Sequence, residues 1–422
     1  MSNSVAKKII SVFSTNIISI LMAVVSVLVL ARGLGTTDRG VYAALLVIPN
    51  LLVSIVEGGV RQSAVYFIGS EKYRINEIIC SLKAYTYMTG ILGYVFCCVV
   101  MYLSLGGDVP IVGVFFASLI VPLTVVYNSY RGIFLGLEVI DKFNHSTWIN
   151  KFIFMIILLY LLFIDDISPS LAIASLVMGL VVSIIYCELV LKGRANFSKK
   201  DVSFNIIFLM LKKGLLFALA LFLIQANYKI DILFMSKLSS LAELGVYSVT
   251  VQVAEIVWQL PAAALVVIMS RSANEKNSNE LVKTVSTTTR IVFWITLVIV
   301  LCSIVFFELF NDLIFGEDYQ GLVKVLVLLS PGLALASFFK TLNAYFAGKG
   351  NPIPSIIAML FAVVVNVLLN LILIPEYGAN GAAIASSISY FIMSLLLVII
   401  YLSKTGERFS SLILIKRSDF RK

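Results

Sequence analysis

The fold is decided by the stretch from Leu223 to Pro261, which reads LIQANYKIDILFMSKLSSLAELGVYSVTVQVAEIVWQLP. It places Lys229 and Asp231 inside one apolar segment, turns at a short loop, and continues as a second apolar segment. The polar residues of this second segment are Ser248, Gln252, Glu255 and Gln259. At about 100° per residue these four positions lie on one side of a helix. Because the segment is too apolar for water, the polar stripe must face protein or a water-filled cavity within a membrane.

An earlier stretch repeats this design. The tripeptide Gly40-Val41-Tyr42 recurs 205 residues later as Gly245-Val246-Tyr247, and at that offset Asn50 corresponds to Glu255. Asn50, Ser54, Glu57 and Arg61 are expected to share one helix face. Two more matches follow in the same order: Ala172-Ile173-Ala174-Ser175 with Ala383-Ile384-Ala385-Ser386, and Phe134 and Gly136 with Phe346 and Gly348. The sequence therefore predicts an internal duplication, with two similar membrane halves.

The composition indicates an all-α integral membrane protein. Of the 422 residues 60% are hydrophobic and only 13% are charged, too little polar surface for a soluble domain. A membrane span needs about 20 apolar residues. Twelve segments meet that need: Ile9–Ala31, Tyr42–Ile68, Ile79–Leu103, Pro110–Leu135, Trp148–Ile164, Leu171–Leu191, Leu215–Met235, Val246–Met269, Ile291–Phe310, Leu322–Ala347, Pro354–Ile374 and Ala382–Leu402. Because six helices per half is an even number, both halves enter the membrane from the same side and form a parallel repeat.

Loop charges predict the orientation. With the N-terminus in the cytoplasm, inner loops and tails hold 21 Lys and Arg residues and outer loops hold 4, as the positive-inside rule requires. The net charge of +9 is thus explained by topology, without nucleic acid. The predicted domains are an N-terminal lobe (1–191), a basic cytoplasmic loop (192–213), a C-terminal lobe (214–402) and a basic cytoplasmic tail (403–422). The FNIIFLML segment of the loop can lie along the membrane surface as a helix.

Several classes of chemistry lack their motifs. The sequence has no GxxxxGK[ST] loop for ATP and no HExxH motif, and His145 is its only histidine. The external loops are too short to hold the catalytic loops of a membrane enzyme that polymerises glycans. We therefore expect a transporter without a cofactor, driven by an ion gradient, a proton gradient or the membrane potential.

The ionisable residues within the spans are the candidate site. Glu57 and Arg61, four residues apart, either neutralise each other or contact a substrate. Lys229 and Asp231 face nearly opposite sides of one helix, so each needs a partner elsewhere. Glu255 has no cation within four residues on its own helix and is the first candidate for proton or cation coupling. The more terminal cations either extend to lipid phosphates or contact substrate: Arg131, Lys151, Arg271, Arg290 and Lys340.

The excess of cations in the spans predicts an anionic substrate. The expected substrate-binding residues are Arg61, Lys229, Arg131, Arg271, Asn50, Gln252 and Gln259. The expected coupling residues are Glu255, Asp231 and Glu57.

At this point the chain resembles the polysaccharide repeat-unit flippases, or O-antigen (Wzx-type) transporters, of the multidrug/oligosaccharidyl-lipid/polysaccharide exporter superfamily. The similarity lies in ARGLGTTDRGVYA from Ala31, in the block KIDILFMSKLSSLAELGVYSVTVQVAEIVWQLP from Lys229, and in NVLLNLILIPEYGANGAAIASSIS from Asn366. The resemblance implies two six-helix lobes around a central cavity, alternating access, and a substrate of undecaprenyl pyrophosphate carrying a short oligosaccharide. It also implies the bacterial inner membrane, with a polysaccharide polymerase and glycosyltransferases as possible partners.

Two alternatives stay open. A drug/cation antiporter of the same superfamily would want an acidic cavity, whereas this interior mixes Arg61 and Lys229 with carboxylates. A membrane enzyme that polymerises glycans would need the large outer loops that the sequence lacks.

Overall fold

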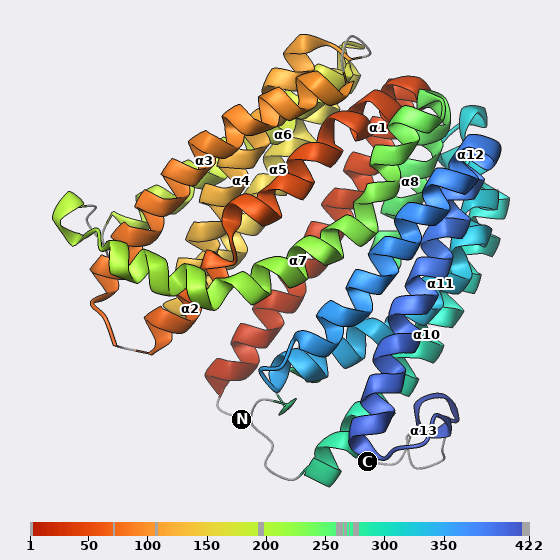
Figure 1. Cartoon of the computed structure of the whole chain (residues 1–422). Helices are drawn as coiled ribbons and strands as arrows, with labels where there is room; N and C mark the ends of the chain where they lie inside the picture. Colours follow the sequence, from red (N-terminus) through yellow and green to blue (C-terminus); the bar gives the residue numbers. More distant parts are fainter. Residues whose placement is uncertain are drawn as a thin grey trace. The chain divides into compact units, whose positions relative to one another are not determined.

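The computed structural model consists of α-helices and their connections (Figure 1). It describes residues 3–70, 72–105, 109–192, 198–258, 265, 268–269, 271–272 and 278–415, and these residues form helices without a β-strand. The helices are α1 (Asn3–Glu57), α2 (Val60–Gly69), α3 (Ile75–Leu105), α4 (Ile111–Gly136), α5 (Ile140–Phe163), α6 (Pro169–Leu191), α7 (Phe204–Leu238), α8 (Leu241–Val257), α10 (Ser278–Ile314), α11 (Gly321–Gly348), α12 (Ile353–Thr405) and α13 (Ser410–Ile413). Two short 3₁₀ turns are η2 (Lys199–Asp201) and η3 (Glu317–Tyr319). The all-α class is confirmed.

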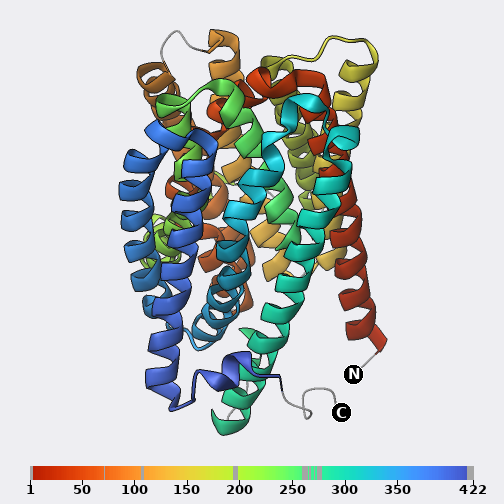
Figure 2. The same cartoon turned by 90° about the vertical axis from the view of Figure 1, so that its right-hand side faces the viewer.

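Nine helical segments among the described residues are long and apolar enough to cross a membrane. Two of them, Ile17–Gly69 and Ile353–Thr405, contain 53 residues each. A straight helix of that length would measure about 80 Å, whereas the hydrocarbon core is about 30 Å thick. Both helices instead double back at a glycine with positive φ, Gly35 (66°) in α1 and Gly378 (52°) in α12. Figure 2 shows the two arms of α12 in lighter and darker blue.

The ends of several helices follow the internal sequence repeat. Adding the offset of 205 residues to Gly35 gives Ser240, the N-cap of α8, so both halves turn at the same place in the repeat. Adding 212 residues to Gly136, where α4 ends, gives Gly348, where α11 ends. Equivalent turns and helix ends are what a duplicated architecture requires.

The chain divides into two compact units, residues 1–225 and 226–422, with the boundary inside α7. In the first unit a buried core joins α2, α3, α4, α6 and the start of α7, around Ile78, Leu82, Tyr130 and Ile133. In the second unit α11 is the central helix, because it packs along α12, α10 and α8 and buries residues on several of its sides.

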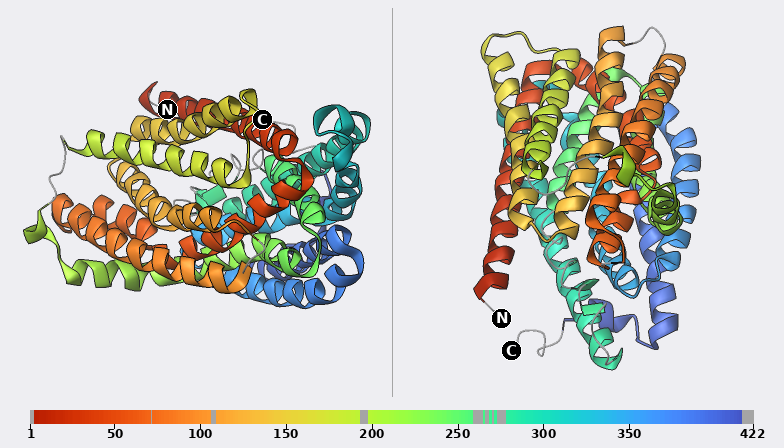
Figure 3. Two further views of the ribbon diagram at one scale, coloured as in Figure 1. Left: turned by 90° about the horizontal axis from the view of Figure 1, so that it is seen from above. Right: turned by 90° about the vertical axis from the view of Figure 1, so that its left-hand side faces the viewer.

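The start of α7 replaces part of the predicted connecting loop. The FNIIFLML segment is helical as expected, but it is continuous with the following apolar residues, since α7 begins at Phe204. Figure 3 (right) views this part of α7 nearly end-on, whereas α3 and α4 run along the page. Phe204 and Phe208 are exposed. An orientation along the membrane surface stays a prediction.

Large apolar side chains cover the outer faces of the helices in both units. In α3 they include Ile91, Leu92 and Val95, and in α10 Val298 and Leu301, each at least half exposed. Soluble monomers avoid such continuous apolar surfaces, whereas lipid tails cover them without cost. The protein is therefore a multi-pass integral membrane protein.

Candidate substrate-binding and coupling sites

In the first unit the candidate site is built around the pair of Glu57 and Arg61. Arg61 Nε lies 2.9 Å from Glu57 Oε1, and Asn128 of α4 donates a hydrogen bond of 3.0 Å to Glu57 Oε2. The continuous helix face expected from Asn50 to Arg61 is interrupted, however. Gly58 and Gly59 both have positive φ, so α1 ends at Glu57 and Arg61 lies in the first turn of α2.

The break has a steric cause in α7. A Cβ atom on Gly214 would lie 2.7 Å from the carbonyl oxygen of Gly59, and a Cβ on Gly59 would overlap the carbonyl oxygen of Gly214. The two backbones therefore touch, and only glycine accommodates both the positive φ and the contact. This crossing fixes where α1 ends and α2 begins, and so fixes the geometry of the Glu57–Arg61 pair.

Two glycines of α4 form the contact surface for α2. A Cβ on Gly132 would lie 2.8 Å from Arg61 Cγ, and one on Gly136 would lie 2.9 Å from Ile68 Cβ. The small residues at this spacing let α2 approach α4 closely. The stem of Arg61 consequently lies against α4, and its side chain retains only 27% exposure.

Arg131 and Lys151 bring two more cations to this region. The Arg131 guanidinium carbon lies 4.5 Å from the centre of the Phe143 ring and 5.5 Å from that of Tyr127. Arg131 interacts electrostatically with Arg61, Glu57 and Lys151. Its Nε is buried and has no hydrogen-bond partner among the described residues. Arg131 thus packs on protein rings and does not extend to lipid.

The charges of this group do not balance. Arg131 interacts with two other cations, Arg61 and Lys151, and in the described part of the first unit Glu57 is the carboxylate that interacts with Arg61 and Arg131. Lys151 Nζ also donates to the Ser19 carbonyl oxygen at 3.3 Å. Among the described residues this group therefore carries a net positive charge, which is costly inside a membrane.

In the second unit Glu255 pairs with Lys229. Lys229 Nζ of α7 lies 2.7 Å from Glu255 Oε1 of α8, and the two side chains are 19% and 37% exposed. Helix α8 has no cation of its own for Glu255, and α7 supplies one in Lys229. The same contact gives Lys229 the partner on another helix that the sequence predicted it would need.

Asp231 has a separate environment. The Tyr247 and Ser386 hydroxyls both donate hydrogen bonds to Asp231 Oδ2, the latter at 2.9 Å, and the carboxylate also accepts the Ile232 N–H at 2.8 Å. Asp231 is 1% exposed. Tyr247 belongs to the repeated Gly-Val-Tyr tripeptide, so one copy of this repeat orients a buried carboxylate.

The remaining predicted residues are more scattered. Asn50 on α1 and Gln252 on α8 are half-buried, and Gln259 lies outside the described residues. Arg271 is exposed and donates a hydrogen bond of 3.3 Å to Thr284. The structure assigns these four residues no shared site.

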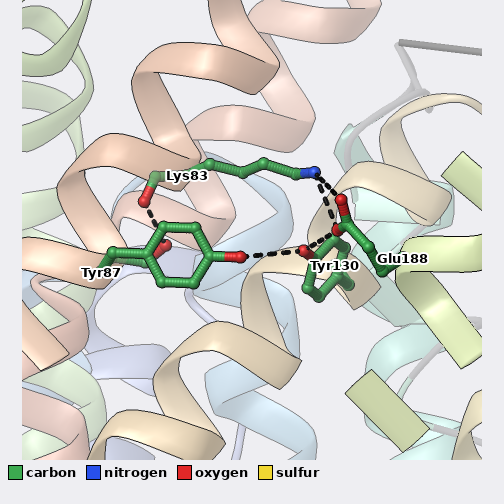
Figure 4. Close-up of polar contacts among 5 residues, drawn as sticks. Lys83, Tyr87, Tyr130 and Glu188 are labelled. Carbon is green, nitrogen blue, oxygen red and sulfur yellow. Dashed lines mark hydrogen bonds and ion pairs between the residues drawn. The ribbon is translucent and has the colours of Figure 1, made fainter. Parts of the chain in front are cut away.

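A network of ionisable residues that the sequence did not indicate joins three helices of the first unit (Figure 4). Lys83 Nζ of α3 lies 2.9 and 3.0 Å from the two carboxylate oxygens of Glu188 on α6. Tyr130 of α4 donates to the same carboxylate, and its hydroxyl lies 3.3 Å from that of Tyr87. The feature of the sequence that could have indicated this network is Lys83, because it is a cation inside a predicted span and needs a counter-charge.

Comparison with known proteins identifies the family. The profile of the polysaccharide biosynthesis protein family matches residues 5–269, more than half of the 422 residues. The chain belongs to the polysaccharide biosynthesis protein family. A second family profile, MatE, matches residues 217–372 of the same chain. The protein is therefore a transporter of the multidrug/oligosaccharidyl-lipid/polysaccharide exporter (MOP) superfamily and not an enzyme. This confirms the resemblance that the sequence showed.

Two individual proteins are similar to this chain. An uncharacterized membrane protein of Methanocaldococcus jannaschii is 24% identical over 424 residues, covering 94% of this chain and 98% of that protein. A probable multidrug resistance protein, NorM of Oceanobacillus iheyensis, is 30% identical over 105 residues, which are 23% of this chain and 24% of that one.

Solved structures share the fold. The lipid II flippase MurJ in an inward closed conformation superposes with a TM-score of 0.73 at 17% identity, covering 98% of this chain and 94% of that chain. An inward-facing multidrug resistance MATE family transporter has a TM-score of 0.70 at 17% identity, with coverages of 92% and 94%.

Proposed function

We propose that this protein flips undecaprenyl-pyrophosphate-linked oligosaccharide repeat units, of O antigen or a similar polysaccharide, to the outer face of the bacterial inner membrane. The observation that carries the proposal is the cation group of Arg61, Arg131 and Lys151, opposed by Glu57. A pyrophosphate bears at least one negative charge per phosphate and cannot enter hydrocarbon without counter-charges. The family match to polysaccharide biosynthesis proteins supports the same substrate class.

The proposed architecture is twelve transmembrane helices in two six-helix lobes, at 1–191 and 214–402, joined by the 192–213 segment. Counting each 53-residue segment as two crossings and adding α8 to the nine candidate spans gives this number. The matching helix ends at Gly136 and Gly348 support the duplication. Alternating access of the two lobes around a central cavity would then move the cargo.

In this proposal the two termini, the connecting segment and the 403–422 tail lie in the cytoplasm. The distribution of 21 inner against 4 outer basic residues supports this orientation. The lipid-linked cargo is made on that side, where a glycosyltransferase would supply it, and a polymerase would consume it on the other.

The residues then take distinct roles. Arg61 offers a planar fork that holds two phosphate oxygens, whereas Lys229 offers one mobile charge. Arg131 adds a second guanidinium beside Arg61. The other residues proposed to contact substrate are Asn50, Gln252, Gln259 and Arg271. Coupling to protons or cations falls to Glu255, Asp231 and Glu57.

A drug/cation antiporter is the second candidate. Two features favour it. The MatE profile matches residues 217–372, and Asp231 is a buried carboxylate, the kind of group that would bind a cationic cargo. The uncompensated cations of the first unit argue against a cationic cargo.

The test is deletion of the gene, followed by measurement of the membrane face on which lipid-linked glycan accumulates. We expect accumulation on the cytoplasmic face and loss of surface polysaccharide. Normal surface polysaccharide with increased drug sensitivity would support the antiporter instead.

A further inference from the structure

Among the described residues, Lys340 of α11 contacts the faces of two aromatic rings. Its Nζ lies 4.0 Å from the centre of the Trp258 ring and 5.7 Å from that of Tyr228. An ammonium has three N–H donors, and for Lys340 no hydrogen bond or ion pair to a described residue accompanies the ring contacts. A ring face attracts a cation through its quadrupole, but it does not replace a counter-ion within a membrane.

The rings hold this position firmly. The centres of Tyr228, Trp258 and Tyr390 lie 5.2 to 5.7 Å from one another, so the three rings form one cluster. The Trp258 Nε1 donates a hydrogen bond of 3.2 Å to the Leu333 carbonyl oxygen of α11 and thereby fixes the indole. Lys340 therefore has a defined resting place.

Glu255 is within the electrostatic reach of both lysines. It pairs with Lys229 at 2.7 Å, and it also interacts electrostatically with Lys340. One carboxylate on α8 thus interacts with a cation on α7 and with another on α11. The Lys229 and Glu255 side chains are 19% and 37% exposed, so the pair is not sealed inside the second unit.

We propose that Glu255 is an internal substitute for the anionic group of the cargo. Without cargo it neutralises Lys229; when a phosphate oxygen takes Lys229, Glu255 transfers to Lys340, which leaves the Trp258 ring. This inference rests on the proposed anionic cargo and assigns Lys340 a positioning role. The exchange is favourable because both states keep Lys229 paired, and the bound state also pairs Lys340, so neither state leaves a carboxylate uncompensated.

Trp258 is a built-in reporter of the exchange. The chain has three tryptophans, Trp148, Trp258 and Trp294, so Trp148→Phe with Trp294→Phe leaves Trp258 as the sole emitter. The full-length protein in lipid nanodiscs is titrated with inorganic pyrophosphate, and binding is measured in parallel by calorimetry. We expect a saturable change in Trp258 emission that follows the calorimetric binding curve, because the ammonium leaves the ring.

A double-mutant cycle separates the exchange from direct binding. Lys340→Met should weaken pyrophosphate binding about tenfold, which is about 1.4 kcal/mol, because the displaced carboxylate then has no cation, and the emission change should disappear. In a Glu255→Gln background the same Lys340→Met substitution should leave the affinity unchanged. Lys324→Met, an exposed cation on the same helix, is the control and should alter neither signal.

Two results would overturn the exchange while leaving the proposed function intact: binding by calorimetry with no change in Trp258 emission, or equal weakening by Lys340→Met in both backgrounds. The second would mean that Lys340 itself contacts the anion. Absence of pyrophosphate binding in every variant, with the protein folded, would contradict both the exchange and the anionic cargo.

Discussion

Arg61 and Glu57 form an ion pair of 2.9 Å across a break in the helix, because Gly58 and Gly59 separate the end of α1 from the start of α2. The pair is therefore not a simple contact between neighbouring turns of one helix. It joins two helices at the point where α7 crosses them, and Arg61 also lies near Arg131. A change in the relative direction of α1 and α2 would change this pair directly.

The first prediction concerns the role of Arg61. Lys cannot replace the planar fork, so we expect Arg61→Lys to impair export and Arg61→Ala to reduce it nearly to background. Surface polysaccharide in a complemented deletion strain measures the effect, with membrane protein levels as the control.

The competing explanation is that Arg61 only neutralises Glu57. In that case the double variant Glu57→Gln, Arg61→Gln should recover export, since neither side chain is then left as an unpaired charge. Recovery would exclude a phosphate-binding role for Arg61; continued failure at normal protein levels would support it.

The second prediction concerns the glycine crossing. Gly59→Ala would place a methyl group against the Gly214 carbonyl oxygen and strain a residue whose φ is 66°. We expect a loss of about 3 kcal/mol of stability, seen as a lower melting temperature of the purified protein. Gly69→Ala is the matched control, because a Cβ there meets nothing within 4 Å. Equal melting temperatures for the two variants would show that the crossing is not tight.

The third prediction concerns Lys83 and Glu188. Glu188→Gln leaves Lys83, whose side chain is 7% exposed, without its carboxylate; because the Glu188 side chain is itself 40% exposed, we expect a loss of about 1–3 kcal/mol of stability. The double variant Lys83→Met, Glu188→Gln should restore the melting temperature. If the double variant is as unstable as the single one, the pair is not what stabilises this junction of α3, α4 and α6.

The fourth prediction concerns coupling through Glu255. A charged carboxylate in a membrane is expensive, so exchange between its ionised and protonated forms can be linked to transport. Glu255→Gln should reach the membrane normally yet lose export or its dependence on the pH gradient. Lys229→Arg should keep partial function, whereas Lys229→Ala should not. Full export by Glu255→Gln with an unchanged response to pH would remove Glu255 from the mechanism.

The helices were predictable from sequence because hydropathy alone decides which segments can lie in lipid. The break at Gly58-Gly59 could have been read from the glycine doublet, but its cause lies in Gly214, far away in the chain. The pairing of Lys229 with Glu255 could not be derived from spacing along either helix, because it depends on how α7 packs beside α8. For the same reason the sequence left Lys340 with two alternatives, a lipid phosphate or the substrate, while the structure places it on the Trp258 ring.

The fifth prediction is topological. Cysteines introduced at Asp165 and Glu376, which are both exposed, should react with an impermeant thiol reagent added from outside the cell. The 21-to-4 distribution of basic residues is the physical reason. Labelling of either position from the cytoplasmic side alone would reverse the proposed orientation.

The most direct test of the central claim is flipping by the purified protein. Proteoliposomes are loaded with undecaprenyl-pyrophosphate oligosaccharide, and the fraction of glycan open to an external glycosidase is followed over time under an imposed gradient. The account predicts that the wild-type protein moves glycan across the bilayer and that Arg61→Ala does not. Equal rates in protein-free liposomes, or export of a cationic drug with no movement of the glycan, would contradict it.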